Sequence, residues 1–536
     1  MRTGRVLTAA SAVARRAFAD SRVRTVAFAL LFILSSVTQA TAYREGYPTL
    51  AERENFARTV GDNDAARMLY GTPRDLLTVG GYVSWRVGGT MVVFAALWGL
   101  LGAVRAMRAD EESGRTELVL AGVISRGEAF LAQLAAIGAG AAVLWLALFV
   151  SLLAGKLPVG GSAYLALAVV SVIPVFVGVG AIASQLAPTK RMATGLATAV
   201  LLVAFVLRMI AAISSAGLGW LRWLTPLGWA EELRPFAGPQ PLVLFLPIVT
   251  APLLLVGAWA LAVRRDIGSG LLPARDSAPP RLRLLGSPVG LALRSERGVL
   301  VAWLVGVGAF AVLMGVISDA ATPDVISENV QRQLEKLGTG SVVTPSGWLG
   351  FSFIFFILAV SLFCCMQIAS VRGEEAEQRL ETLLALPVGR RDWLARRVLL
   401  AASGAAAVAL AAGLLAWAGA ASQGADVSLP EMLGAGANTL PPALLFLGLG
   451  ALAFALVPRS STVIAYGLVG LAFVWELFGS LLEVPDWLLA LSPFHDVGLV
   501  PGEPFEATAA AIMLMLAALA ALAALWAFRR RDLTAA

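Results

Sequence analysis

Two charged segments of the sequence carry acidic and basic residues in a matching order. The first is RAMRADEESGRTELVLAGVISR, residues 105–126, and the second is VRGEEAEQRLETLLALPVGRR, residues 371–391. The matching pairs are Glu111 with Glu375, Arg115 with Arg379, Glu117 with Glu381, and Arg126 with Arg390. Acidic residues at the start and Arg at the end complement a helix dipole, so each segment is predicted to form a short helix on the inner membrane surface. One copy is typical of a simple interfacial helix, whereas two matching copies favour a pair of equivalent docking sites.

Side chains for enzyme chemistry are scarce. The chain has one histidine, His495, in a predicted outer loop, and its only cysteines, Cys364 and Cys365, are adjacent within an apolar run. We expect these cysteines to serve packing rather than a disulfide or a metal site. No GxxxxGK[ST] phosphate loop occurs, so any nucleotide hydrolysis must come from a partner chain. We therefore predict no catalytic residue, no metal site and no cofactor in this chain.

Two charged residues lie inside apolar stretches. Arg208 occurs in LLVAFVLRMIAAI and Glu476 in GLAFVWELFGSLL, at equivalent positions of two predicted spans. A charge in lipid is costly and normally faces a cavity or a partner. We predict that Arg208 and Glu476 approach one another near a central translocation pathway. The alternative is that each side chain extends to the outer interface, a turn or two away.

Tryptophan and proline gather after the same two spans. The residues are Trp220, Trp223, Pro226 and Trp229 after the first of them, and Trp487 and Pro493 after the second. Indole rings prefer the headgroup zone of a bilayer, so this pattern is typical of an aromatic belt at the outer interface.

The elements that position these residues are predicted to be transmembrane helices. The chain of 536 residues is 58% hydrophobic and 14% charged, whereas soluble domains carry roughly 25% charged residues. Apolar stretches of membrane-spanning length recur along the whole sequence. They cover residues 25–43, 83–104, 132–154, 163–187, 192–214, 242–263, 299–318, 349–370, 397–421, 439–457, 462–482 and 508–528. The predicted fold is therefore an all-α integral membrane protein with about twelve transmembrane helices in two pseudo-symmetric six-helix halves.

The loops predict the domain boundaries and the orientation. Residues 264–298 are rich in Pro, Gly and Arg and form a predicted cytoplasmic linker with an interfacial helix, between a first domain at 1–263 and a second at 299–536. Most Lys and Arg fall on one side of the predicted membrane, which places both termini in the cytoplasm. The basic N-terminal segment is expected to form an amphipathic helix on the inner leaflet. Residues 51–71 and 324–338 are predicted to be amphipathic helices in the outer loops.

The two charged segments resemble the cytoplasmic coupling segment of type-2 ABC permeases. Two such units in one chain resemble the actinobacterial permeases described as exporters of polyketide antibiotics, of the tetronasin type. The resemblance implies a permease subunit in the bacterial cytoplasmic membrane that exports hydrophobic or amphipathic small molecules. It also implies two copies of a separate ATPase chain that holds ATP and Mg, with no nucleic acid involved.

The same resemblance implies roles for particular residues. Glu111, Arg115, Glu117 and Arg126 would face one ATPase subunit, and Glu375, Arg379, Glu381 and Arg390 would face the other. The segments after spans five and eleven would form short outer helices that help to close an outer gate.

Two other classes of membrane protein compete with this interpretation. A proton-driven secondary drug transporter also has about twelve spans and cytoplasmic termini, but it typically places carboxylates within its spans. Glu476 is the only acidic residue well inside a predicted span. A membrane-embedded enzyme is disfavoured because His, Cys and carboxylate clusters are missing.

Overall fold

The computed structural model describes residues 2–61, 64–212, 217–266, 268, 270–272, 288–318, 344–385, 387–479 and 492–532. The chain divides into two compact units, Met1–Ala278 and Pro279–Ala536, here called the first half and the second half. The division falls inside the predicted linker. The end of that predicted linker is helical, because helix α14 begins at Pro288.

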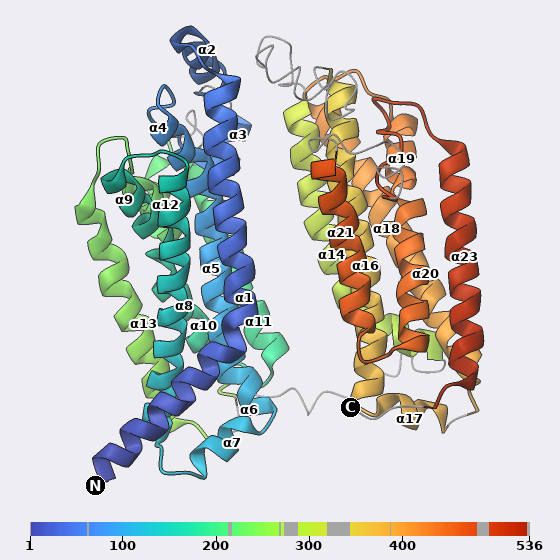
Figure 1. Ribbon diagram of the computed structural model, residues 1–536, viewed down its shortest axis with the longest axis horizontal. Coiled ribbons are helices and arrows are strands. Elements are labelled where there is room, and N and C mark those ends of the chain that lie inside the picture. Colours follow the sequence, from blue (N-terminus) through green and yellow to red (C-terminus); the bar gives the residue numbers. More distant parts are fainter. Residues whose placement is uncertain are drawn as a thin grey trace. The chain divides into compact units, whose positions relative to one another are not determined.

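The first half consists of helices joined by short connections (Figure 1). They are α1 (Arg2–Gly46), α2 (Leu50–Gly61), α3 (Asp64–Tyr70), α4 (Val79–Val83), η1 (Ser84–Gly88), α5 (Gly89–Val104), η2 (Arg105–Ala109), α6 (Asp110–Glu112), α7 (Arg115–Leu120), α8 (Arg126–Ala154), α9 (Val159–Val170), α10 (Val172–Leu186), α11 (Lys190–Ala212), η4 (Gly219–Leu224), α12 (Pro226–Glu232), η5 (Pro241–Leu244) and α13 (Phe245–Arg264). Helices α2 and α3 confirm the helical prediction for residues 51–71.

The second half repeats this order of long helices. They are α14 (Pro288–Ser318), α16 (Pro345–Ala376), α17 (Arg379–Leu384), α18 (Arg390–Ser422), α19 (Leu429–Asn438), α20 (Leu440–Leu456), α21 (Ser461–Gly479) and α23 (Ala507–Arg530). The predicted outer helix at 324–338 lies outside the described residues.

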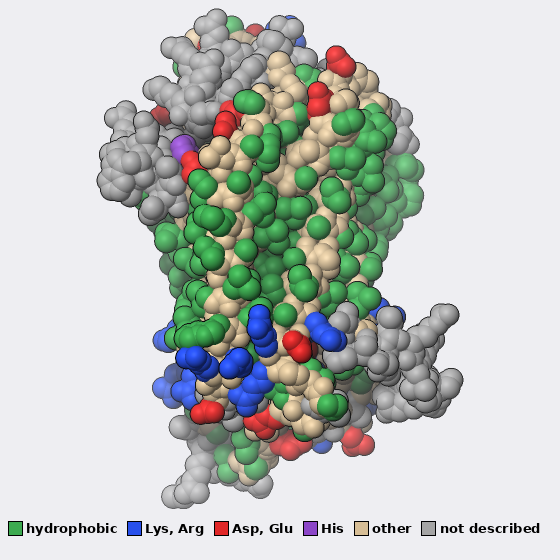
Figure 2. Space-filling view, turned by 90° about the vertical axis from the view of Figure 1, so that its right-hand side faces the viewer, with side chains coloured by type: hydrophobic (Ala, Val, Ile, Leu, Met, Phe, Trp, Pro, Cys, Tyr) green, Lys and Arg blue, Asp and Glu red, His purple; other side chains and the backbone are tan. Residues whose placement is uncertain are grey.

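Eleven helical segments among the described residues are long and apolar enough to cross a membrane, and Ser461–Glu476 of α21 is a shorter apolar helix. Each of the twelve predicted apolar stretches overlaps one of these twelve segments. Figure 2 shows one face of the molecule with a broad hydrophobic band and with Lys and Arg side chains gathered toward one end. The chain is therefore an all-α, multi-pass membrane protein, as predicted.

The two halves pack their spans in the same order. Helix α1 packs on α8, α5 on α10, and α10 on α11 and α13. In the second half, α14 packs on α18, α16 on α20, and α20 on α21 and α23. Each half thus joins its first span to its third, its second to its fourth, and its fourth to its fifth and sixth. This shared order confirms the predicted pseudo-symmetry.

Small residues allow the backbones of paired spans to touch. A Cβ atom added to Gly315 of α14 would lie 2.2 Å from the carbonyl oxygen of Ala416 in α18. A Cβ atom added to Gly419 of α18 would lie 2.3 Å from the carbonyl oxygen of Val312 in α14. Close approach of this kind supplies the van der Waals contact that drives helix association in lipid.

The N-terminal segment differs from its prediction. Residues 2–46 form one continuous helix of 45 residues, α1, rather than a separate interfacial helix followed by a span. No Gly or Pro interrupts the segment around Arg15, Arg16 and Asp20, and an ion pair between Arg16 and Asp20, one turn apart, is compatible with the helix continuing.

Candidate functional site

A short helix follows the second span of each half, at the predicted positions. Helices α7 and α17 have six residues each and carry Glu at their third position, Glu117 and Glu381. Gly114 precedes α7 with φ +72°, and Gln378 precedes α17 with φ +59°. A residue in the left-handed region ends a helix, so the chain turns before each short helix begins.

This turn changes the place of the predicted acidic residues. Asp110, Glu111 and Glu112 form the last turn of the second span rather than the start of the short helix. Glu374 and Glu375 likewise lie near the end of α16. The predicted helix-dipole arrangement is wrong on this point, because the left-handed residue separates the acidic run from the helix that follows it.

The short helices themselves are exposed. Arg115 of α7 and Arg379 of α17 each have 62% of the side chain exposed, and Glu117 and Glu381 are exposed as well. Leu118, between these charges in α7, is 78% exposed. Helix α7 therefore exposes both charged and apolar side chains.

Arg265, directly after the sixth span, ties three other spans of the first half together. Its Nη2 donates to Glu111 at 2.6 Å, and its Nε donates to the side chain of Gln185 in α10 at 3.1 Å. The carbonyl oxygen of Arg265 accepts from Arg126, the first residue of α8, at 2.7 Å. We call Glu111, Arg126 and Arg265 the Arg265 cluster.

The residues that follow Arg265 remain in contact with this cluster and with the end of α10. The backbone N–H of Gly268 donates to Glu111 at 2.5 Å. The N–H groups of Leu271 and Leu272 donate to the carbonyl oxygens of Gln185 and Leu186 at 3.2 and 2.9 Å, at the end of α10. The first residues of the predicted linker therefore form part of the first half.

Arg531, directly after the last span, makes the equivalent contacts in the second half. Its Nη2 donates to the buried carboxylate of Glu375, and its Nη1 donates to the carbonyl oxygen of Phe454 in α20 at 2.6 Å. The carbonyl oxygen of Arg531 accepts from Arg390, the first residue of α18, at 2.7 Å. We call Glu375, Arg390 and Arg531 the Arg531 cluster.

The clusters divide the eight predicted interface residues into two groups. Glu111 is 9% exposed and Glu375 is 3% exposed, so these two lie in the interior and not on the predicted surface. The physical reason is that a partly buried arginine neutralises each carboxylate. Arg126 and Arg390 bond to the end of the sixth span of their own half. Arg115, Glu117, Arg379 and Glu381 remain exposed.

Sequence reasoning missed Arg265 and Arg531. A signal for them exists in the repeat, because Arg-Arg-Asp follows the sixth span in both halves, at 264–266 and 530–532. The two charged segments end well before Arg265 and Arg531, so a comparison of these segments alone could not identify them.

The charges inside the spans have partners within their own halves. Arg208 of α11 forms a buried ion pair with Glu231 of α12. Glu476 of α21 lies 3.5 Å from Nδ1 of His495. The predicted approach of Arg208 to Glu476 is therefore not needed to neutralise either charge, because the segment after each span supplies a local partner.

The predicted aromatic belt has both exposed and buried members. Trp220 and Trp223 are exposed, as an interfacial position requires. Trp229 is buried and donates from Nε1 to the carbonyl oxygen of Trp223 at 2.6 Å. Pro226 is the first residue of α12, and Pro493 is half-buried. Trp487 lies outside the described residues.

Comparison with known proteins gives one family and one relative. The family described as "Multidrug efflux system permease Rv1217c, C-terminal domain" matches residues 53–261 and 285–529. The chain is 35% identical over 521 residues to the multidrug efflux system permease protein Rv1217c of Mycobacterium tuberculosis. This alignment covers 95% of the chain and 92% of the relative.

Proposed function

The chain belongs to the multidrug efflux permease family of Rv1217c, and from this membership we propose that it is the membrane subunit of an ATP-driven ABC exporter. The cargo proposed is a hydrophobic or amphipathic small molecule, such as a drug or a polyketide-like antibiotic. The relative's name supports multidrug efflux, and the resemblance of the charged segments to type-2 ABC coupling segments supports the ATP-driven mechanism.

One observation carries this proposal: an exposed short helix occurs in equivalent positions of both halves. Arg115 and Glu117 of α7 correspond to Arg379 and Glu381 of α17, and all four are exposed. Two equivalent surfaces suit two copies of one ATPase subunit, which would bind ATP and Mg and dock one on each short helix.

The Arg265 and Arg531 clusters supply a route from each short helix into the bundle. Glu111 lies four residues before Arg115, and it bonds to the end of the sixth span through Arg265. Arg126 follows the short helix and bonds to the same arginine at its carbonyl oxygen. A displacement of α7 by a docked ATPase would therefore pull on the second, third and sixth spans together.

The orientation is also part of the proposal. Both short helices lie at the end of their half that carries the Arg-rich segments after the sixth span, such as Arg264 and Arg265 (Figure 1). The positive-inside rule places this end in the cytoplasm, together with both termini. The proposed location is the bacterial cytoplasmic membrane.

Charge reversal on the short helices tests the ATPase docking. The double variant Glu117→Arg and Glu381→Arg should lose copurification of an ATPase subunit that contains a phosphate loop, and should lose ATP-dependent drug uptake into inverted vesicles. Glu54→Arg is the matched control, because Glu54 is an exposed glutamate of α2 at the opposite end of the first half. Unchanged copurification and uptake in the double variant would contradict the docking surface.

A proton-driven transporter is the second candidate, because Glu476 and His495 form a pair of titratable groups at 3.5 Å. The two functions separate in sealed vesicles. ATP without a proton gradient should drive uptake under the first proposal, whereas a proton gradient without ATP should drive it under the second. The variant Glu476→Gln should abolish only the second kind of transport.

A further inference from the structure

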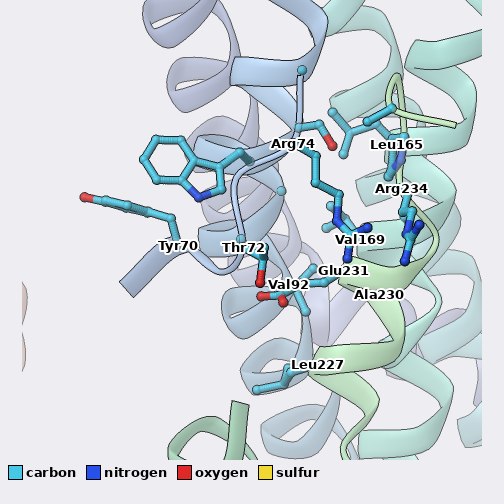
Figure 3. Close-up of a pocket in the computed structure, with 18 of the residues that line it drawn as sticks. Tyr70, Thr72, Arg74, Val92, Leu165, Val169, Leu227, Ala230, Glu231 and Arg234 are labelled. Carbon is cyan, nitrogen blue, oxygen red and sulfur yellow. The ribbon is translucent and has the colours of Figure 1, made fainter. Parts of the chain in front are cut away.

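A small cavity lies in the first half, at the end opposite to α7. Its volume is about 40 Å³, and its polar lining includes Arg74, Arg208, Glu231 and Arg234. Figure 3 shows Arg74, Glu231 and Arg234 around the cavity, beside the apolar side chains of Val92, Leu165, Val169 and Leu227. The cavity therefore joins a charged wall to an apolar wall.

Arg208 lines this cavity and has one buried donor without a partner. Its side chain is 2% exposed. Its Nε donates to Glu231, and its Nη1 donates to the carbonyl oxygen of Leu69 at 3.3 Å. Its Nη2 is buried and has no acceptor among the described residues. An unpaired guanidinium N–H away from water is costly, so this donor favours an anionic acceptor in the cavity.

Two glycines allow the chain to pack closely around that donor. A Cβ atom at Gly71 would lie 2.0 Å from Oε1 of Glu231 and 2.9 Å from Nη2 of Arg208. A Cβ atom at Gly89 would lie 2.1 Å from the carbonyl oxygen of Tyr70 and 3.1 Å from the same Nη2. Gly71 has φ +93°, a conformation that favours glycine. Any larger residue would displace the partner of Arg208, Glu231, at the first position or clash with the backbone of Tyr70 at the second.

The charges around the cavity leave an excess of positive charge. Arg74, Arg222 and Arg234 all bond to Glu232, at 2.5, 2.7 and 2.6 Å. Arg208 bonds to Glu231. Four arginines thus face two glutamates, a formal excess of two positive charges in a half-buried group. A bound anion would offset this excess.

We propose that this cavity binds the carboxylate group of a small or amphipathic molecule, with Arg208 as the principal donor. The volume of about 40 Å³ has room for roughly three water-sized atoms, which is the size of a carboxylate. The apolar wall suits a ligand that continues as a hydrocarbon. The corresponding span of the second half carries Glu476, so the site belongs to the first half alone. The proposal is independent of the energy source for transport.

Thermal unfolding of the detergent-purified chain tests the site with defined probes. Sodium acetate represents a water-soluble carboxylate and sodium octanoate an amphipathic one; sodium chloride at equal ionic strength and octanol are their controls. Acetate, octanoate or both should raise the unfolding temperature of the wild type in a saturable manner, beyond the matching control. A response to acetate alone identifies a water-soluble source, and a stronger response to octanoate identifies an amphipathic one.

Three variants locate the response. Arg208→Lys keeps the charge but removes the forked donor, and should weaken the apparent affinity about tenfold or more, the equivalent of one charge-assisted hydrogen bond. The double variant Arg208→Gln and Glu231→Gln keeps the net charge of the site and should abolish the response while the chain still folds. Arg44→Gln, which removes a half-buried arginine bonded to Gly155 elsewhere in this half, should respond as the wild type does.

Two results would overturn the site. One is a wild type in which neither carboxylate exceeds its control. The other is a folded double variant whose response equals that of the wild type, since the carboxylate would then bind elsewhere.

Discussion

Neutralising Glu111 tests how the short helix is connected to the bundle. Its carboxylate accepts from Arg265 at 2.6 Å, from the Gly268 N–H at 2.5 Å and from Arg108 at 3.2 Å. The side chains of Glu111 and Arg265 are 6% and 7% exposed. Removal of one partner from a buried ion pair typically costs about 3–5 kcal/mol. Glu111→Gln keeps the shape of the side chain, and its amide oxygen can still accept from Arg265 and Arg108. We therefore expect the free energy of unfolding to fall by an amount near the lower end of this range, about 3 kcal/mol.

The second half offers a repeat of the same experiment. Glu375→Gln removes the partner of Arg531, and the two clusters share the same bonding pattern, so the loss of stability should be of similar size. Glu117→Gln is the matched control, because it neutralises an exposed glutamate six residues after Glu111. Exposed charges contribute about 0–1 kcal/mol, so this control should unfold within a few degrees of the wild type.

Two assays separate stability from coupling. Thermal unfolding in detergent measures the first, and drug-stimulated ATPase activity of the reconstituted complex measures the second. We expect Glu111→Gln to keep the ATPase subunit bound and to lose most of the drug stimulation. The charge-exchanged variant Glu111→Arg and Arg265→Glu should recover part of both properties.

Both roles of the ion pair are refuted if Glu111→Gln unfolds at the wild-type temperature and retains full drug stimulation. That result would mean that the ion pair neither stabilises the half nor transmits movement. Loss of stability with intact stimulation would keep the structural role and refute transmission through this pair.

Three further predictions use other features of the structure. Burial favours a raised pKa for Glu232, but hydrogen bonds from Arg222 and Arg234 and the charge of Arg74 outweigh burial and lower the pKa below the ordinary 4.5. The stabilising contribution of the ionised Glu232 should therefore be present above pH 4.5 and disappear as pH falls through the lowered pKa. Glu232→Gln should flatten that part of a plot of unfolding temperature against pH. Gln378→Gly should stabilise the second half by about 1 kcal/mol and Gly114→Ala should destabilise the first by a similar amount, since both positions are left-handed; thermal unfolding of each variant measures this. Gly419→Val should separate α18 from α14, because its Cβ would lie 2.3 Å from a backbone oxygen, and a disulfide between cysteines placed on the two helices should form more slowly than in the chain that keeps Gly419 and carries the same two cysteines.

The helices were predictable because a membrane imposes a length and a composition on each span. All twelve apolar stretches overlap observed helices, and the charged repeat located α7 and α17. The residues at which these helices begin and end were harder to predict. The left-handed backbone at Gln378 ends α16, and nothing in the composition around a glutamine predicts that conformation.

The ion pairs were not predictable from the charged segments alone. Glu111 and Arg265 are 154 residues apart in the chain, so only the packing of the second span near the sixth brings them together. The equivalent positions of Arg208 and Glu476 in the two halves suggested that their side chains approach one another. In the structure each of them uses a partner from the segment that follows its own span, Glu231 for Arg208 and His495 for Glu476.

The hydrogen bonds of Gly268, Leu271 and Leu272 bear on whether the fused chain needs to be continuous. Because these residues complete the Arg265 cluster, a break in the polypeptide after Leu272 would leave all described contacts of the first half in place. The two halves could then be produced as separate polypeptides, each with its own arginine cluster. Fusion would then ensure that one copy of each half is made. A break before Gly268, by contrast, would remove a hydrogen-bond donor to Glu111.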